Sequence, residues 1–414
     1  MKVAHILRKY DPSQWAGTET YLSTLYGVLK NDYIESQFYY PERESQFIND
    51  PLRAHHQLIP YSACVPVWGI SKASKKQLKD IGGNLMSFDL PWRLWHSGAD
   101  VIHSHTLGRL GAIGRFVANR KNIPFVITIH GGFLDLPHET EKQLTAPLKG
   151  GVEWGKIFGA LLRSRQLVQD ADAVIAVNQN EYQQLIDAYP GKRIELINSG
   201  IDTALYEANC KGIAYQKWPQ LKEKKVLLEV GRIDPVKNQF WLLEQFVSIA
   251  KKEPQALLVF AGPVTHSDYF YRLQAKVKDE KLSERVLFTG GFAYDDPELI
   301  GLYQVADVCV LPSVAEPFGL VMLEAWAAKK PVVANRTTGS MQLVVQSQNG
   351  FLFDVSHPET FHQGIQKLLE DKKLAEKMGK QGFEKVLGHY DTKIMAKKTL
   401  KLYQEIIEQK AKIS

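Results

Sequence analysis

The run 311–328 carries two glutamates, Glu316 and Glu324, and no other charged residue. Pro317 suits the first position of a helix, because proline lacks the N–H that would be unpaired there, so we predict Glu316 as the N-cap. The unpaired amides of the first turn then belong to three residues, Phe318, Gly319 and Leu320. Because such amides attract anions, the run predicts a site for an anionic ligand.

Glu324 lies in a predicted helix that is apolar on nearly every face. A helix of this kind is normally buried, and a buried carboxylate without hydrogen-bond donors is costly. Helical side chains tilt toward the N-terminus, so Glu324 is expected to lean toward the anion-attracting end. A ligand that has both hydroxyl groups and negative charge would satisfy Glu324 and the helix start together.

Two basic residues, Arg232 and Lys237, follow Gly231 in a predicted strand-to-helix turn. A guanidinium fork and an ammonium group can together neutralise a diphosphate without a metal ion, although charges that simply face solvent are the alternative. The GxxxxGK[ST] pattern is absent, so the turn is not a P-loop. Two further predicted strands end in glycine turns, at Gly262 and Gly290, whose backbone groups could hold a flat ring.

In the first half of the chain a histidine and a glycine follow predicted strands. His130 ends a strand and precedes two glycines, which favours contact with a sugar hydroxyl over a purely structural role. His103 and His105 end the preceding strand, and either role stays open for them. Gly17 begins a predicted helix, where the backbone could approach a phosphate or a sugar; an ordinary helix start is the alternative.

Short β-branched runs alternate with helical patterns through both halves of the chain. This alternation is typical of parallel sheets whose strands are joined by crossover helices. The strands expected in the first half are 2–7, 35–40, 99–105, 124–130, 172–178 and 194–198. Those expected in the second half are 225–230, 256–260, 285–288, 306–311, 331–334 and 350–353. The predicted fold class is therefore α/β, with two doubly wound domains.

The domain boundaries are predicted from interruptions of this pattern. We expect an N-terminal domain over 1–208 and a C-terminal domain over 209–390, with the polar, lysine-rich segment 210–225 as a linker. Residues 41–97 are rich in proline and tryptophan and show no clear period, so they are interpreted as an irregular insertion. Residues 391–414 are predicted to form a helix that packs back on the first domain.

The composition is that of a globular protein: 44% of the 414 residues are apolar and 23% are charged. No apolar stretch is long enough to span a membrane, and the start of the chain does not resemble a signal peptide, so a cytoplasmic location is expected. The three cysteines are scattered and lack CxxC spacing, which argues against a disulfide framework and against structural zinc.

Most of the net charge of +6 comes from residues 371–414, which hold eleven lysines and six acidic residues. The plainer interpretation is a solvated helical face. The alternative is attraction to an anionic membrane, for which the basic segment 71–79 and the tryptophan-bearing segment 91–95 are better placed. Nucleic acid is not an expected partner, because no basic and aromatic platform or known binding motif is present.

The order and spacing of these motifs resemble the retaining glycosyltransferases of family 4, which have the GT-B fold, nearly from end to end. The E-x7-E element formed by Glu316 and Glu324 is the most specific part of the resemblance. The other parts are Ala16-Gly-Thr-Glu19, Thr128-Ile-His-Gly131, Asn198-Ser-Gly-Ile-Asp202 and Gly231-Arg-Ile-Asp-Pro-Val-Lys237. One departure is Ala16, where the family usually has a second glycine.

The resemblance implies two Rossmann-like domains facing across a cleft, and it implies roles for the residues singled out above. Glu316 would hold hydroxyls of the transferred sugar, and Glu324 would hold the ribose. Arg232 and Lys237 would bind the diphosphate and stabilise its charge as it leaves. The predicted catalytic residues are His130, Glu316, Arg232 and Lys237. The predicted donor-binding residues are Gly17, Gly231, Arg232, Lys237, Gly262, Gly290, Glu316, Phe318, Gly319, Leu320 and Glu324.

The implied reaction moves a hexose from a nucleotide-diphosphate sugar to a hydroxyl of a glycan or glycolipid, in the synthesis of bacterial envelope polysaccharide or glycoconjugate. Front-side attack is favoured over double displacement, because Glu316, as an N-cap aimed at hydroxyls, is not placed as a nucleophile. No cofactor and no metal are expected, and UDP-sugars are favoured over GDP-sugars as donors. The alternatives are an epimerase or phosphorylase of the same fold, or a catalytically silent nucleotide-sugar-binding subunit. A dehydrogenase is disfavoured, because GxGxxG does not follow the first strand.

Overall fold

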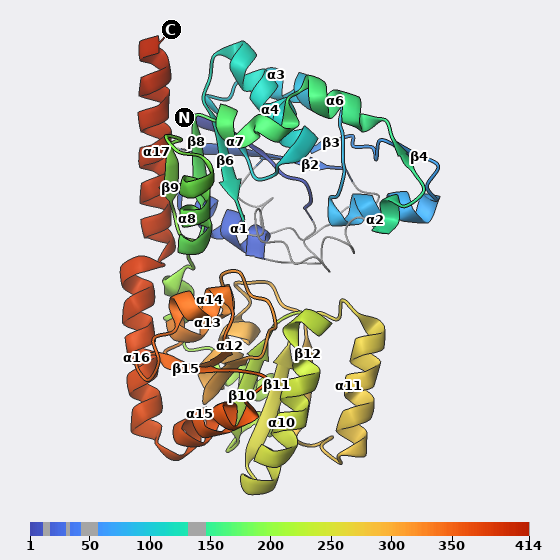
Figure 1. Cartoon of the computed structure of the whole chain (residues 1–414). Helices are drawn as coiled ribbons and strands as arrows, with labels where there is room; N and C mark the ends of the chain where they lie inside the picture. The colour runs from blue at the N-terminus through green and yellow to red at the C-terminus, as the bar shows by residue number, and fades with distance from the viewer. Residues whose placement is uncertain (11–16, 30–33, 43–56, 131–145, 414) are drawn as a thin grey trace. The chain divides into compact units, whose positions relative to one another are not determined.

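A computed structural model describes residues 1–10, 17–29, 34–42, 57–130 and 146–413 (Figure 1). Contacts divide the chain into two compact units. Unit 1 consists of Met1–Ser199 with Lys393–Ser414, and unit 2 consists of Gly200–Thr392. The division falls earlier than the predicted boundary at 208, because Ile201 and Tyr206 are buried in the core of unit 2.

Unit 1 is built on a sheet of seven strands in the order β3-β2-β1-β5-β6-β8-β9, and every neighbouring pair in it is parallel. The strands are β1 (Lys2–Ile6), β2 (Glu35–Pro41), β3 (Gln57–Tyr61), β5 (Val101–Ser104), β6 (Phe125–Ile129), β8 (Ala173–Ala176) and β9 (Ile194–Leu196). Its α-helices are α1 (Gly17–Leu29), α2 (Lys72–Ile81), α3 (Leu90–Trp95), α4 (Gly108–Lys121), α6 (Gly155–Leu161), α7 (Leu167–Asp170), α8 (Gln179–Ala188) and α17 (Thr392–Ile413).

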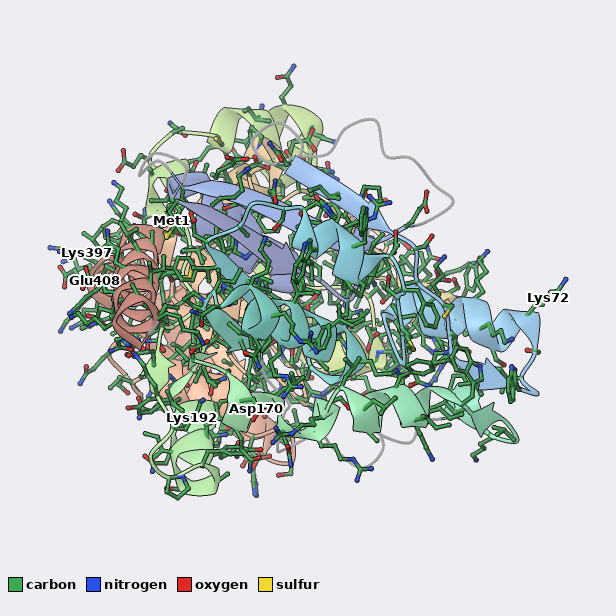
Figure 2. The ribbon with its side chains drawn as sticks, turned by 90° about the horizontal axis from the view of Figure 1, so that it is seen from above. Met1, Lys72, Asp170, Lys192, Lys397 and Glu408 are labelled. Atoms are coloured by element: carbon green, nitrogen blue, oxygen red, sulfur yellow. The ribbon has the colours of Figure 1, made fainter. Side chains whose placement is uncertain are left out.

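Helices cover both faces of this sheet, as a doubly wound fold requires. Successive strand residues point to opposite faces, so Val3 packs with α1 and α17 while Ala4 packs with α3, α4 and α7. The C-terminal helix α17 contributes Leu402 and Tyr403 to the core of unit 1. Figure 2, which views the ribbon along another axis, shows Lys397 on this helix.

The segment predicted as an irregular insertion is more regular than expected. Strand β3 extends the sheet by pairing with β2, and α2 and α3 follow it. A short antiparallel pair, β4 (Val67–Trp68) and β7 (Val152–Glu153), forms a separate two-stranded sheet that is not part of the main sheet. The prediction missed β3 because Pro60 argues against a strand, yet proline is tolerated in an edge strand, which is the position that β3 has.

Unit 2 has a six-stranded parallel sheet in the order β12-β11-β10-β13-β14-β15. The strands are β10 (Lys225–Val230), β11 (Ala256–Ala261), β12 (Val286–Gly290), β13 (Val308–Leu311), β14 (Val332–Asn335) and β15 (Gly350–Phe353). The α-helices are α9 (Lys211–Lys217), α10 (Gln239–Lys252), α11 (Ser267–Asp279), α12 (Pro297–Val305), α13 (Leu320–Ala327), α14 (Thr338–Leu343), α15 (Pro358–Glu370) and α16 (Lys372–His389).

The core of unit 2 lies on both faces of its sheet. Helices α9, α12 and α13 pack on the face that bears Leu228, and α10, α11 and α15 pack on the face that bears Leu227.

The prediction of a linker over residues 210–225 is wrong. The segment contains α9, and the Cys210 amide donates to Gln304 Oε1 at 2.8 Å, while Trp218 is buried in the core. The two parallel sheets confirm the predicted α/β fold class. Of the helices that the structure describes, none is both long and apolar enough to cross a membrane.

Candidate active site

Ligands of doubly wound sheets bind where the chain leaves neighbouring strands in opposite directions. In unit 2 this switch point lies between β10 and β13, which pair at the centre of the sheet. The loop after β10 carries Arg232 and Lys237, and the loop after β13 carries Glu316. Sequence reasoning placed all three at strand ends, and the sheet order brings the two loops together.

The two loops are joined by an ion pair and by backbone bonds. Lys237 Nζ donates to Glu316 Oε2 at 2.6 Å, and the two side chains are only 19% and 15% exposed. The Val314 amide donates to the Val236 carbonyl at 2.9 Å, and Asn238 Nδ2 donates to the Pro312 carbonyl at 3.3 Å. Glu316 is therefore fixed beside Lys237, at the carboxyl end of the central strands.

The helix after β13 begins later than predicted. Helix α13 starts at Leu320 and its N-cap is Gly319, so the prediction of Glu316 as N-cap and Pro317 as first helical residue is wrong. Gly319 has φ 92°, a left-handed conformation that glycine adopts at little cost, and it turns the chain before the helix can begin. Leu320 belongs to the first helical turn, whereas Phe318 and Gly319 precede it.

A neighbouring loop supports this irregular turn. The Gly339 amide, at the start of α14, donates to the Glu316 carbonyl at 2.8 Å. A Cβ at Gly339 would lie 2.4 Å from the Phe318 carbonyl oxygen, so the two backbones meet where only glycine fits. Phe318 is buried in the core of unit 2. The backbone from 316 to 319 is thus positioned by packing rather than by a helix.

Glu324 is buried in α13, at 8% exposure, and the described part of the chain supplies one side-chain donor to it. The Tyr303 hydroxyl, from α12, donates to Glu324 Oε2 at 2.5 Å. Burial raises the pKa of Glu324, and the hydrogen bond from Tyr303 opposes that rise. Sequence reasoning expected Glu324 to need donors but did not identify Tyr303, because no local pattern links a residue of α12 to one of α13.

Sequence reasoning also missed Glu229, the third carboxylate of this region. Glu229 is 2% exposed at the end of β10, and Gln239 Nε2 donates to both of its oxygens at 3.3 Å. Burial raises the pKa of Glu229 to about 8, although the positive charge of Lys237 and the bond from Gln239 act in the opposite direction. The available signal was a carboxylate one residue before the strand end, directly after the apolar run 226–228.

The predicted glycines lie at three neighbouring strand ends. A Cβ at Gly231 would lie 2.8 Å from Glu229 Oε1, and one at Gly262 would lie 2.0 Å from the Gly231 carbonyl oxygen. Gly290 ends β12 with φ 82°. Arg232 is exposed, and its carbonyl accepts from Gln239 Nε2 at 2.8 Å. Gly231 and Gly262 are therefore required by close packing within the protein, whereas the space beside Gly290 is open.

In unit 1, the predicted residues lie near a group of histidines. His130 follows β6 directly, and its Nε2 is 3.0 Å from Nδ1 of His105. Burial, together with the nearby positive charge of Arg8, lowers the pKa of His130 to about 3. Gly17 is the first residue of α1. Its neighbour Ala16 and the glycines after His130 lie outside the described residues.

Comparison with known proteins decides the family. Residues 15–205 match the family described as Glycosyltransferase Family 4, and residues 213–385 match Glycosyl transferases group 1. The two matches follow one another along most of the chain, in the order that a GT-B enzyme has. The chain belongs to the group 1, family 4 glycosyltransferases. It is therefore a transferase with the GT-B fold.

Individual relatives of this glycosyltransferase agree with that assignment. The D-inositol 3-phosphate glycosyltransferase of Corynebacterium glutamicum is 26% identical over 338 residues, which cover 78% of this chain and 76% of the relative. HepE from Anabaena, solved with UDP and glucose, is similar with a TM-score of 0.73 at 20% identity, over 98% of this chain and 99% of HepE. Sucrose-phosphate synthase from Thermosynechococcus elongatus has a TM-score of 0.71 at 20% identity and covers 99% of both chains.

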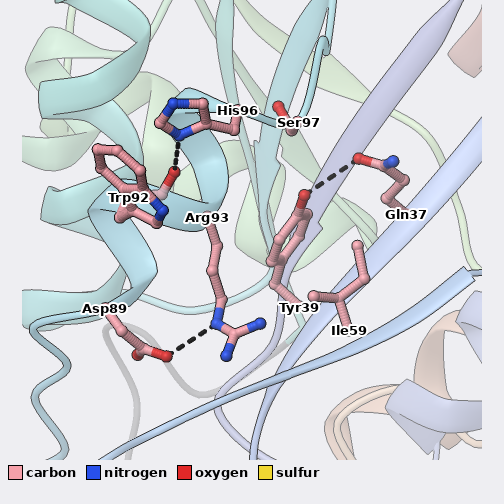
Figure 3. A pocket seen from close by; sticks show the side chains of 8 residues that line it. All are labelled: Gln37, Tyr39, Ile59, Asp89, Trp92, Arg93, His96 and Ser97. Carbon is pink, nitrogen blue, oxygen red and sulfur yellow. Dashed lines mark hydrogen bonds and ion pairs between the residues drawn. The ribbon is translucent and has the colours of Figure 1, made fainter.

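The glycosyltransferase also has a surface pocket of about 450 Å³ on unit 1, between β2, β3 and α3 (Figure 3). It is lined by Gln37, Tyr39, Ile59, Asp89, Trp92, Arg93, His96 and Ser97. Arg93 Nε donates to Asp89 Oδ2 at 2.8 Å, so the acidic side chain of Asp89 balances the positive charge of Arg93 in this pocket. Among the described residues that line it, none belongs to the predicted site.

Proposed function

We propose that this glycosyltransferase moves a hexose from a nucleoside diphosphate to a hydroxyl group with retention of anomeric configuration. The observation that carries the proposal is the Lys237–Glu316 pair at the switch point of unit 2. An ammonium group has three N–H donors, so Lys237 can hold Glu316 and a phosphate oxygen together. Glu316, fixed by that bond, keeps its second oxygen for hydroxyls of the transferred sugar.

Charge stabilisation is the main catalytic effect in this proposal. Arg232 and Lys237 bind the diphosphate and stabilise the negative charge that grows on it as the bond to the sugar breaks. The amide of Leu320 at the start of α13 adds a dipole of the same sign. Glu324, supported by Tyr303, binds the ribose hydroxyls, and the turns at Gly262 and Gly290 border the base. His130 contacts hydroxyls of the transferred sugar.

The proposed chemical step is a front-side displacement. The acceptor oxygen forms a bond to the anomeric carbon on the face from which the diphosphate leaves, and the acceptor proton passes to a phosphate oxygen of the leaving group. No covalent bond to the enzyme forms. The ion pair with Lys237 favours this route, because a carboxylate neutralised by an ammonium group is a weak nucleophile.

UDP-hexoses are the proposed donors, ahead of GDP-sugars, and neither a metal ion nor a cofactor is required. Support comes from the structural similarity to HepE, whose structures contain UDP or UDP-glucose. Metal independence is supported by the residues themselves. Arg232, Lys237 and the start of α13 supply the positive charge that a divalent cation would otherwise provide.

The proposed acceptor is a glycan or glycolipid of the bacterial envelope, reached from the cytoplasmic face of the membrane. Unit 1 offers a surface for peripheral contact. Helix α2 carries four lysines, of which Lys72 marks its outer end in Figure 2. The exposed side chains nearby in the sequence include Trp68, at 64%, and Trp92, at 69%. Lysines with exposed tryptophans suit an anionic bilayer surface.

Ligand binding and turnover test the proposal separately. In a thermal-shift screen of UDP, GDP, ADP and their sugar conjugates, we expect UDP and a UDP-hexose to raise the Tm most. Saturating ligand at 100 times its Kd adds about 2.7 kcal/mol to stability. Nucleotide release should then require an acceptor, supplied as an envelope glycolipid extract or as D-inositol 3-phosphate. An epimerase would release no nucleotide, and a phosphorylase would require phosphate. A silent binding subunit would be stabilised by the nucleotide and show no turnover with any acceptor.

A further inference from the structure

Three histidines of unit 1 form a file of hydrogen-bonded rings that leads from the inside of the sheet to its carboxyl edge. His5 lies in β1, His105 follows β5, and His130 follows β6. His5 Nδ1 is 3.2 Å from His105 Nε2, and His105 Nδ1 is 3.0 Å from His130 Nε2. The backbone amide of His105 donates to the Ile6 carbonyl at 2.9 Å, which ties the backbone of the middle histidine to β1. The remaining ring nitrogen of His130 is Nδ1.

The surroundings keep the rings of His105 and His130 uncharged. His5 and His105 are buried, and His130 is half-buried with the edge of the Tyr21 ring against it. Burial lowers the pKa of His105 well below its ordinary value, and neighbouring His103 and His130 lower it further. A neutral imidazole has one donor and one acceptor nitrogen. In a file of neutral rings, the tautomer of one ring therefore decides the tautomer of the next.

His103 lies against this file but is not part of it. Its Nε2 is 2.7 Å from Thr128 Oγ1, and its Nδ1 is 2.5 Å from the Tyr403 hydroxyl, with the Tyr26 hydroxyl at 3.3 Å. Both of its nitrogens are engaged by hydroxyl groups. His103 is therefore the matched control for the file: it has the same residue type and the same burial, and its ring is 4.2 Å from that of His105.

A metal ion is the competing explanation for this cluster. Among the described residues, one group of three or more potential metal ligands has its ligand atoms within 4.8 Å of one another. It consists of His5, His103 and His105. Binding an ion through His103 would, however, break its bond to Thr128 or to Tyr403, and binding through His105 Nε2 would break its bond to His5. The hydrogen-bonded arrangement gives both ring nitrogens of His103 and of His105 a partner without an ion.

We propose that His105 is a positioning residue, whose bond to Nε2 of His130 holds that ring in one tautomer, so that His130 presents a single defined nitrogen to the transferred sugar. The proposal rests on the function proposed above for His130. Two states of the file satisfy it. If each ring donates toward His130, then Nδ1 of His130 carries the proton and donates to the sugar. If each ring donates toward His5, then Nδ1 accepts from a sugar hydroxyl. In both states a break at His105 frees His130 to exchange its tautomers.

Two amide substitutions separate this positioning role from simple packing. Asparagine places its amide near the position of Nδ1, and glutamine places it near that of Nε2. His105→Asn therefore keeps a partner for His130, whereas His105→Gln keeps a partner only for His5. We expect His105→Gln to lower kcat by up to about tenfold with little change in the donor KM, and His105→Asn to retain most of kcat. The control His103→Asn should lower the Tm and leave kcat within about threefold.

Equal losses of kcat in His105→Asn and His105→Gln, measured on samples with the same folded fraction, would show that His105 acts only by filling space. That result would overturn the proposal. A rise in KM with unchanged kcat in both variants would overturn it as well, because a positioning residue for a transition-state contact acts on kcat.

Nuclear magnetic resonance tests the file without any substrate, so it stays informative if no donor or acceptor is turned over. In the full chain with ¹⁵N-labelled histidine, the His130 signals are identified by their loss in His130→Gln. We expect one neutral tautomer of His130 between about pH 6 and pH 8 in the wild type and in His105→Asn, and a mixture of tautomers in His105→Gln. An unchanged His130 tautomer in His105→Gln would contradict the proposal.

Addition of zinc chloride to the labelled wild-type protein distinguishes the metal site. We expect the ring signals of His5, His103 and His105 to stay unchanged and no zinc to remain bound after gel filtration. Retention of one zinc per chain, with shifts confined to these three rings, would assign the cluster to a metal and overturn the proposed role of His105.

Discussion

The carboxyl ends of the two sheets carry different kinds of side chain, although both sheets are parallel and doubly wound. In unit 2 the strand ends bring together Lys237 and Glu316 as an ion pair, and Arg232 lies on the same loop as Lys237. In unit 1 the corresponding strand ends bring together neutral imidazoles. The charged edge suits the binding and release of a diphosphate. The neutral edge suits hydrogen bonding to a sugar, where a full charge would be costly to bury. Substitutions should therefore have larger and more charge-dependent effects in unit 2.

The largest effect is expected from Lys237→Ala, which removes the cation beside Glu316. Loss of a group that stabilises charge in the transition state lowers kcat by about 10² to 10³. The matched control is Lys276→Ala, which removes a lysine of the same unit that pairs with Glu280 at 2.9 Å on an exposed helix. Steady-state kinetics should show no change in the control. Equal losses in both variants would break the distinction between the switch point and the rest of unit 2.

Glu316→Gln is expected to lower kcat by about 10² by weakening the hold on the sugar hydroxyls and the bond from Lys237. Because the proposed route has no enzyme-bound sugar, mass spectrometry of the variant after incubation with donor should show the unmodified protein mass. A glycosylated protein would contradict front-side attack and make Glu316, or a residue near it, a nucleophile.

His130→Ala is expected to have a smaller effect, a loss of about tenfold in kcat, because it removes one hydrogen bond from a neutral group. His362→Ala is the control, since His362 is also partly buried and its Nε2 lies 3.1 Å from Gln245 Oε1. If His130→Ala lowered kcat as much as Lys237→Ala, the neutral edge would contribute as strongly as the charged one, and the contrast between the units would fail.

Glu229 predicts a pH dependence of stability. Its pKa is raised to about 8 in the folded protein, and the ordinary value is 4.5. Between these values the folded state binds more protons than the unfolded state, so stability falls as pH rises through this window. Glu229→Gln removes the titration and should flatten the decline, which amounts to a few kcal/mol. Urea unfolding of both proteins at about pH 6 and pH 9 measures it. An equal decline in both would show that Glu229 is not the group responsible.

The smallest effect is expected from metal removal. Activity in excess EDTA should stay within about twofold of the untreated enzyme, because side-chain cations and the helix dipole replace a divalent ion. Magnesium added back to an EDTA-treated sample is the control. A loss of activity that magnesium restores would show that the charges of unit 2 are insufficient without a metal.

Much of the fold could be predicted from local pattern. The strands 225–230 and 350–353 were predicted with the bounds that the structure has, because runs buried on both faces are mainly apolar, with Lys225 and Glu229 as the exceptions. Regions governed by packing were not predictable. The segment 210–225 looked like a linker, since its polar residues hide the spacing by which Cys210, Ala214 and Trp218 enter the core. Strand β3 was missed because the effect of Pro60 depends on its place at the sheet edge.

The sequence alone determined which residues could do chemistry: the E-x7-E element, the Arg232 and Lys237 turn, and His130 at a strand end. Tertiary structure decided what they contact. Strand order brought Lys237 to Glu316, and the left-handed Gly319 moved the helix start to Leu320. The packing of α12 on α13 supplied Tyr303 to Glu324, and parallel pairing of β1, β5 and β6 aligned three histidines. Such contacts join residues far apart in the chain, and no local periodicity encodes them.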